Sequence, residues 1–349
     1  MRIAVTGATG NVGSAVVRRL HHDGHEVVGV VRRPPEDADP ADWVRADLSS
    51  DCHDDLVRAF RGADAVVHLA WGFQPTHRID YLESVGVGGT RRVLDAVAAA
   101  GVPHLVHQSS IGAYSPRRGT EPVREDWPTG GIAASPYSRH KATAERLLDT
   151  FEGRAEVVVT RTRPGIISQR AAGSAQLRYF LPTLVPAAAV RHVPVLPLDR
   201  RLTLQVVHAD DVARAIALAI EARAPGPFNL VTEPVLDRSD VAAALGARPV
   251  HVPFPVVRAA ADLSWRAHLQ PVDAGWIDMA YHVPLLDASR ARTELGWVPG
   301  HDATAVLATM VEAMASAEHG SSEVLRPRTI ADGVRRALRR GPVGQRPRP

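Results

Sequence analysis

The fold is decided by the stretch Thr6-Gly7-Ala8-Thr9-Gly10-Asn11-Val12-Gly13, which joins an apolar run at Arg2–Thr6 to an amphipathic run at Asn11–His22. Glycines spaced G-x-x-G-x-x-G between a strand and a helix permit a tight turn, a close approach of a pyrophosphate to the backbone and tight helix–strand packing. The N–H groups of the helix would face that anion. The residues predicted to bind it are Gly7, Thr9, Gly10, Asn11, Val12 and Gly13.

Short β-branched runs alternate with longer helical runs beyond this stretch, which is typical of βαβ units and a parallel sheet. Strands are predicted at 26–31, 43–46, 65–70, 104–109 and 157–161, and helices at 54–60, 82–100 and 137–151. Later elements are a strand at 204–208, a helix at 210–221 and a strand at 227–231. We therefore predict an α/β fold, a Rossmann-type doubly wound parallel sheet with a smaller C-terminal substrate-binding region.

Three parts of the chain are distinguished by these patterns. Residues 1–164 are predicted to be a dinucleotide-binding domain, and residues 165–318 a substrate-binding region interwoven with the core. Residues 319–349 form a basic tail rich in arginine and proline, which we expect to be disordered. An amphipathic helix at Thr329–Arg340 is the alternative for this tail.

Composition excludes several classes of protein. With 45% hydrophobic and 23% charged residues among 349, the chain is not disordered throughout. Cys52 is the only cysteine, which excludes an internal disulfide and suits a reducing compartment. The sequence shows no signal-peptide pattern and no apolar run long enough to span a membrane, so we expect a cytoplasmic protein. The net charge is +3, but the last thirty residues contribute +6, so the body is about −3 and neither nucleic acid nor membrane is expected to bind it.

The end of the second predicted strand, Val30-Val31-Arg32-Arg33, bears on the choice of nicotinamide cofactor. A carboxylate here would accept hydrogen bonds from the adenosine ribose and repel a 2′-phosphate. Arg32 and Arg33 stand there instead, and a guanidinium group suits a phosphate. We therefore expect NADP in preference to NAD. The alternative is that both arginines are solvated loop charges.

Lys141 is the only lysine in a chain with 41 lysine and arginine residues. Tyr137 precedes it by four residues in a helical segment, so the two side chains share one face. An ammonium beside a phenol favours the phenolate, and we expect it to lower the pKa of Tyr137 towards the range useful for proton transfer. Arginine lacks the compact ammonium, which explains the retained lysine. Tyr137 and Lys141 are predicted to be catalytic.

The glycine stretch and the motif Tyr137-Ser138-Arg139-His140-Lys141 resemble those of the short-chain dehydrogenase/reductase superfamily. Over residues 1–318 the chain is similar to the extended, epimerase/dehydratase-type branch. The resemblance implies a third catalytic residue, Ser110, four residues before Tyr114 in a Ser-Ser-x-x-x-Tyr segment. It also implies cofactor contacts by Asp47, Leu48, Leu69, Ala70, Pro164, Tyr137 and Lys141.

The chemistry that the resemblance implies is hydride transfer between the nicotinamide and a carbinol or carbonyl carbon. Tyr137 would pass the hydroxyl proton and Ser110 would hold the substrate oxygen. Lys141 would tune Tyr137 and anchor the nicotinamide ribose. The partner is then a small alcohol or carbonyl compound; a homodimer would follow only by analogy with relatives.

Departures from the family pattern reduce the number of reactions that we expect of this chain. Gly86 stands where the family commonly has an asparagine, which puts a proton relay through that side chain in doubt. Ile111 and Gly112 follow Ser110 in place of the acidic pair of sugar 4,6-dehydratases, so dehydration is not expected.

The residues that contact the nucleotide diphosphate in epimerases are also missing. Gly165 or Ile166 stands in place of the usual asparagine, and Leu204 stands in place of the usual arginine. Four aromatic residues hint at a less polar ligand: Trp71, Phe73, Tyr179 and Phe180. The leading hypothesis is therefore an NADP-preferring oxidoreductase for a small or moderately apolar alcohol or carbonyl. A sugar epimerase with a transient keto intermediate and a non-catalytic NADP-binding regulator are the alternatives. No metal is predicted.

Overall fold

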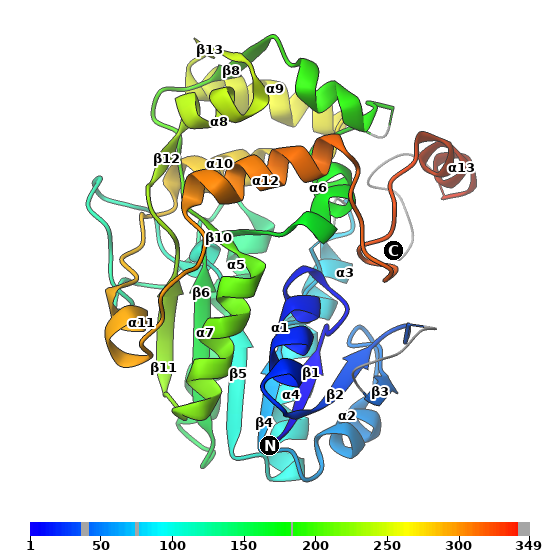
Figure 1. Ribbon diagram of the computed structural model, residues 1–349, viewed down its shortest axis with the longest axis vertical. Helices are drawn as coiled ribbons and strands as arrows, with labels where there is room; N and C mark the ends of the chain where they lie inside the picture. The colour runs from blue at the N-terminus through cyan, green and yellow to red at the C-terminus, as the bar shows by residue number, and fades with distance from the viewer. Residues whose placement is uncertain (36–41, 74–76, 183, 341–349) are drawn as a thin grey trace.

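A seven-stranded parallel sheet forms the centre of the molecule (Figure 1). The structure is a computed structural model that describes residues 1–35, 42–73, 77–182 and 184–340. The strand order is β11-β6-β5-β4-β1-β2-β3, which reverses beside β1 as in doubly wound folds, so the predicted fold class is confirmed. The strands are β1 (Arg2–Thr6), β2 (Glu26–Val31), β3 (Asp42–Arg45), β4 (Ala65–His68), β5 (His104–Gln108), β6 (Val158–Pro164) and β11 (Gly226–Leu230).

Helices cover both faces of this sheet because successive strand residues point to opposite sides. Ile3 and Val5 of β1 belong to the core beneath α1 (Asn11–His22) and α7 (Ala209–Glu221). Ala4 between them faces the second core cluster. That cluster lies beneath α2 (His53–Phe60), α4 (Gly89–Ala100) and α5 (Pro136–Glu152).

Two of the predicted elements are divided in the structure. The helix expected at 82–100 consists of α3 (Ile79–Glu83), a π-helical turn at Ser84–Gly88 and then α4. The strand expected at 204–208 is divided into β9 (Thr203–Leu204) and β10 (Val206–His208). Gln205 lies between them, and its buried side-chain amide bonds to both the N–H and the carbonyl of Leu286.

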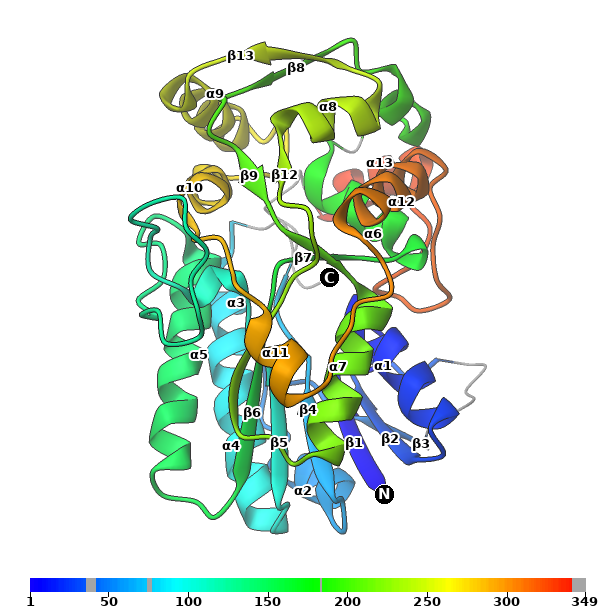
Figure 2. The same cartoon turned by 60° about the vertical axis from the view of Figure 1, so that its left-hand side comes forward.

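The chain after Gly165 forms a smaller layer over the carboxyl ends of the strands (Figures 1 and 2). Its strands also include β7 (Ile166–Ser168), β8 (Val195–Leu198), β12 (Leu236–Asp237) and β13 (Arg248–His251). Its helices are α6 (Gly173–Phe180), α8 (Arg238–Leu245), α9 (Phe254–Arg266), α10 (Ala274–His282) and α12 (Ala303–Ala315), with 3-10 turns at Arg170–Ala172 and Ala187–His192. Helix α11 (Ser289–Glu294) packs beside β11 instead, and a further 3-10 turn at Ile111–Ala113 follows β5. Strand β11 returns from this layer to pair in parallel with β6.

One segment of the basic tail, which the sequence analysis expected to be disordered, is described as a helix. Residues Ile330–Arg340 form α13, the element that the sequence offered as the alternative. Its apolar side chains recur every four residues, as helical periodicity requires. Residues 341–349 lie outside the described residues. In the part of the chain that is described, no helix is both long and apolar enough to cross a membrane.

Candidate active site

A cavity of about 870 Å³ is lined by the carboxyl ends of the sheet strands and by the C-terminal layer. Open parallel sheets bind their ligands at this end, where the strand order reverses. Every residue predicted for the site lines this one cavity: Gly7, Thr9, Gly10, Asn11, Val12, Gly13, Arg32, Arg33, Asp47, Leu48, Leu69, Ala70, Ser110, Tyr137, Lys141 and Pro164. The fold thus brings together positions that are far apart in the sequence.

The glycine stretch forms the wall of the cavity at the start of α1. Gly7 has a φ of 71°, and a Cβ there would lie 2.7 Å from the backbone nitrogen of Ala70. A Cβ on Gly13 would overlap the carbonyl oxygen of Gly7. Gly10 caps α1 without a side-chain hydrogen bond, so no side chain satisfies the first N–H groups of the helix. This cradle fits the pyrophosphate of a dinucleotide.

Two guanidinium groups follow β2, as the sequence indicated, and both have protein partners. Arg32 donates a hydrogen bond to the hydroxyl of Tyr81 at 3.0 Å. Arg33 forms an ion pair of 3.3 Å with Glu323, a residue of the C-terminal tail. The arginines are therefore held at the cavity wall rather than fully solvated.

The other predicted cofactor contacts follow the ends of β3, β4 and β6. Asp47 accepts hydrogen bonds from the N–H and the hydroxyl of Ser49, at 2.9 and 2.7 Å, so its carboxylate also closes a turn. Leu69 and Ala70 follow β4, where their backbone lies against the glycine stretch. Pro164 ends β6. All of these predicted contacts line the cavity.

Tyr137 lies in a cluster of aromatic rings at the start of α5. The rings of Trp71 and Phe73 meet it edge-on, with centroid distances of 6.4 and 5.5 Å. Trp276 of α10 lies against it at 4.9 Å. Tyr137 is therefore half-buried among rings, and the side chain of Ser110 lies close enough to its hydroxyl to lower its pKa.

Burial shifts the pKa values of Tyr137 and Lys141 more than the neighbouring charges and hydrogen bonds do. It raises the pKa of Tyr137 to about 12, and the hydrogen bond with Ser110 only partly opposes it. Burial also lowers the pKa of Lys141 to about 7, against the attraction of Glu145. The sequence analysis expected a lowered pKa for Tyr137 and did not account for desolvation. At neutral pH the phenol is held as a proton donor.

Ser110 lies beside Tyr137 on the turn after β5. Its oxygen accepts a hydrogen bond from the N–H of Gly112 at 3.0 Å. A Cβ on Gly112 would come within 3.1 Å of the Tyr137 ring and 3.0 Å of the Met279 sulfur. A glycine here therefore allows the serine and tyrosine hydroxyls to approach one another.

Gly86, where the family commonly has asparagine, has a structural explanation. A Cβ at this position would come within 2.9 Å of the Trp71 indole. The same indole lies under the ammonium of Lys141, which is 3.6 Å from the ring centroid. That ammonium also donates to the carbonyl of Gln108 at 2.8 Å. Trp71 thus fills the place of an asparagine side chain and stabilises the lysine by a cation–π contact.

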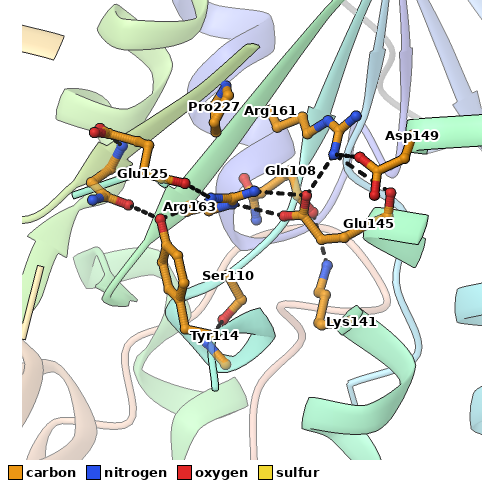
Figure 3. Close-up of polar contacts among 12 residues, drawn as sticks. Gln108, Ser110, Tyr114, Glu125, Lys141, Glu145, Asp149, Arg161, Arg163 and Pro227 are labelled. Atoms are coloured by element: carbon orange, nitrogen blue, oxygen red, sulfur yellow. Dashed lines mark hydrogen bonds and ion pairs between the residues drawn. The ribbon is translucent and has the colours of Figure 1, made fainter. Parts of the chain in front are cut away.

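A buried ionic network holds α5 against β6 (Figure 3). Glu145, which has no exposed surface, accepts hydrogen bonds from Arg163 at 2.8 and 2.9 Å and from Arg161 at 2.9 Å. Arg163 continues to the hydroxyl of Tyr114 at 2.9 Å, which donates to Asn229 of β11 at 2.7 Å. Although burial alone would raise the pKa of Glu145, the two arginines and a serine hold it at about 2.

Away from the predicted cofactor positions the lining of the cavity is mainly apolar, with Gln176, Thr203, Gln205 and Tyr281 among it. Its aromatic and aliphatic lining includes Trp71, Phe73, Tyr179, Phe180, Leu196, Leu202, Val257, Trp276, Met279, Leu307 and Met310. Among the described lining residues, the charged ones are Arg32, Arg33, Asp47, Lys141 and Glu323, all at the predicted cofactor positions or beside them. Within the same described ranges, no group of three His, Cys, Asp or Glu side chains is placed to hold a metal.

Sequence reasoning missed two residues of this site. Glu145 is four residues after Lys141, so helical spacing alone places it on the same face. Trp276 comes from α10, far along the chain, and no local pattern connects it with Tyr137. The four aromatic residues that suggested a less polar ligand all line the cavity.

Comparisons with known proteins agree with this architecture. Residues 3–230 match the model of the NAD dependent epimerase/dehydratase family. An uncharacterised protein of Mycobacterium tuberculosis is 28% identical over 306 residues, or 87% of this chain but 29% of that protein. The chain thus spans less than a third of the length of the first relatives it matches.

Other relatives have named activities. A 2-alkyl-3-oxoalkanoate reductase of Stenotrophomonas maltophilia is 31% identical over 238 residues, covering 65% of this chain and 67% of the reductase. A UDP-glucose 4-epimerase of Mycolicibacterium smegmatis is 33% identical over 163 residues, covering 43% and 51%. The solved structure of MoeE5 in complex with UDP-glucuronic acid and NAD has a TM-score of 0.68 and 25% identity, covering 90% of this chain and 99% of MoeE5.

The ionic network predicts a large effect of one substitution. Glu145→Gln leaves two buried guanidinium groups without their central partner, and we expect it to lower the free energy of unfolding by about 3–5 kcal/mol in urea titrations. Because the pKa of Glu145 is held at about 2, its contribution is complete above about pH 4.5 and is lost as the pH falls towards 2. The difference between the two proteins should therefore shrink in acid.

Asp149→Asn is the matched control, because Asp149 bonds to Arg161 from the same helix but its side chain is 60% exposed. We expect it to cost less than about 1 kcal/mol. Equal losses for the two variants would contradict the central role of Glu145.

Proposed function

This chain belongs to the NAD dependent epimerase/dehydratase family, and we propose that it is an oxidoreductase that transfers a hydride between NAD or NADP and an apolar alcohol or carbonyl compound. The family resemblance predicted from the sequence is confirmed by this membership. We assign the cofactor phosphates to the glycine cradle and the start of α1, and its nicotinamide ribose to Lys141. Arg32 and Arg33 favour NADP.

The observation that carries the proposal is the distribution of charge in the cavity. Ser110 and Tyr137 both line the cavity, and Tyr137 has Lys141 one turn further along α5 and the rings of Phe73 and Trp276 against it. A carbonyl group on an apolar molecule would satisfy both hydroxyls and leave the rest of the ligand among aromatic and aliphatic side chains. A diphosphate would find no cation on that side among the described lining residues.

The residues of this chain would act as follows. Bound nicotinamide would supply or accept the hydride. In the direction of reduction, Tyr137 donates its proton to the substrate oxygen, since its raised pKa keeps the phenol protonated. Ser110 holds the same oxygen by a hydrogen bond. The ammonium of Lys141 stabilises the phenolate that forms until solvent returns the proton.

A sugar epimerase with a transient keto intermediate is the second candidate, supported by the epimerase among the relatives. The apolar lining argues against a nucleotide-sugar substrate. The presence of both Tyr137 and Lys141 argues against a non-catalytic regulator.

Tyr137→Phe removes the hydroxyl and keeps the ring. We expect about a 10²- to 10⁴-fold loss of turnover with little change in cofactor affinity, measured by steady-state kinetics and fluorescence titration. Tyr179→Phe, at another tyrosine of the cavity, is the control and should change turnover only a few-fold. Turnover by Tyr137→Phe close to that of the unmodified protein would refute the assignment.

The pKa of Lys141 predicts the pH dependence of cofactor binding. In the free protein its ammonium is lost as the pH rises through about 7. If the bound cofactor needs the ammonium, binding takes up a proton above this pH, so affinity for the reduced cofactor should fall up to about tenfold per pH unit between pH 7 and 9. Lys141→Met should remove this dependence; a sloping profile in that variant would assign the proton to another group.

Cofactor consumption separates the two candidate functions. An oxidoreductase consumes one reduced cofactor per substrate, whereas an epimerase needs only a catalytic amount. Incubated with NADPH and a panel of carbonyl compounds of increasing apolar chain length, the protein should oxidise the cofactor fastest with the more apolar members. Turnover of UDP-sugars without net change in cofactor absorbance would favour the epimerase.

A further inference from the structure

The segment of residues 320–328, which we name the C-terminal strap, passes beside the start of α1 on its way from α12 to α13 (Figures 1 and 2). The hydroxyl of Ser322 donates a hydrogen bond to the carbonyl of Thr9, in the glycine stretch, at 2.8 Å. Glu323 and Val324 line the cavity. The strap is therefore a wall of the predicted cofactor site, although it lies beyond residue 318, where the family resemblance ends.

The strap is fixed to the C-terminal layer by apolar and polar contacts. Leu325 is 3% exposed and belongs to a small core cluster against which Tyr179 packs. Arg178 of α6 donates to the carbonyl of Arg326 at 2.6 Å. Arg328 donates to the carbonyl of Val185 at 2.8 Å. Ser322 before Glu323 and these anchors after it hold the strap, and the Glu323 carboxylate also pairs with the guanidinium of Arg326 at 2.5 Å.

That carboxylate lies 3.3 Å from the guanidinium of Arg33. NAD-specific sites normally have an acid at the end of the second strand, which repels a 2′-phosphate. The second strand of this chain ends in arginines instead, but the strap brings a carboxylate to the same guanidinium. A 2′-phosphate that reached Arg33 would compete with Glu323 for its donors and would be repelled by its charge.

We propose that Glu323 determines cofactor choice by weakening the binding of dinucleotides that carry a 2′-phosphate, relative to those that do not. Arg32 and Arg33 attract this phosphate, and Glu323 opposes them. The preference between NADP and NAD is then set jointly by β2 and by a residue near the other end of the chain. The proposal rests on the proposed function only in requiring that a nicotinamide dinucleotide binds in the cavity.

The solvent exposure of the Arg33–Glu323 ion pair limits how much Glu323 can change the affinity for NADP. The Arg33 and Glu323 side chains are 57% and 45% exposed, so solvent screens their interaction. We expect removal of the Glu323 charge to tighten NADP binding by about 3- to 10-fold and to change NAD binding by less than about 2-fold. Added salt should reduce the difference.

The test is the pair of dissociation constants of the full chain for NAD and NADP, measured by isothermal titration calorimetry before and after Glu323→Gln. Glu312→Gln is the matched control, because Glu312 is 53% exposed in a 3.0 Å pair with Arg170 and does not line the cavity. It should leave both constants unchanged.

Arg33→Ala should weaken NADP about tenfold, and on that background Glu323→Gln should have a smaller selective effect, because only the direct repulsion of the 2′-phosphate by its charge remains to be removed. If both dinucleotides bind and Glu323→Gln leaves their ratio unchanged, or tightens both equally, the role of Glu323 is overturned. If neither dinucleotide binds the unmodified protein, the proposed function fails instead.

Discussion

The carboxylate of Glu145 joins α5 to β6 through two buried guanidinium groups, and the placement of the reactive side chains depends on it. Buried charges are tolerated only when they are paired with good geometry. The ion pairs of Glu145 therefore allow α5 to pack on β6 in only one orientation about the helix axis. This orientation directs Tyr137 and Lys141 into the cavity. The same carboxylate also attracts the ammonium of Lys141, which burial would otherwise drive further towards the neutral form.

The charged lining residues of the cavity are those at the predicted cofactor positions or beside them, and Tyr137 lies against the aromatic rings of Phe73 and Trp276. An apolar ligand would complete the exclusion of water that the aromatic rings begin. Exclusion of water strengthens the hydrogen bonds of Ser110 and Tyr137 to a substrate oxygen, because little solvent competes for them. The aromatic rings thus have two effects: they exclude water from the site, and they raise the pKa of Tyr137.

The sequence predicted those features that depend on local spacing. The strand, turn and helix around Gly7 follow from glycine positions, and Lys141 was identified because the chain otherwise uses arginine. The raised pKa of Tyr137 was not predicted, because desolvation depends on rings from other elements. Glu323 was counted only as a charge of the tail, since nothing local connects it with Arg33. Long-range contacts of this kind leave no periodic pattern in the chain.

Strand β11 completes the sheet only after a long excursion of the chain through the C-terminal layer. Until residues 226–230 have left the ribosome, β6 is an unpaired edge with free backbone donors and acceptors. Asn229, which bonds to Tyr114, is also missing until then. The dinucleotide-binding half is therefore not expected to mature as a separate unit during synthesis, and fragments that end before β11 should be prone to edge-to-edge aggregation.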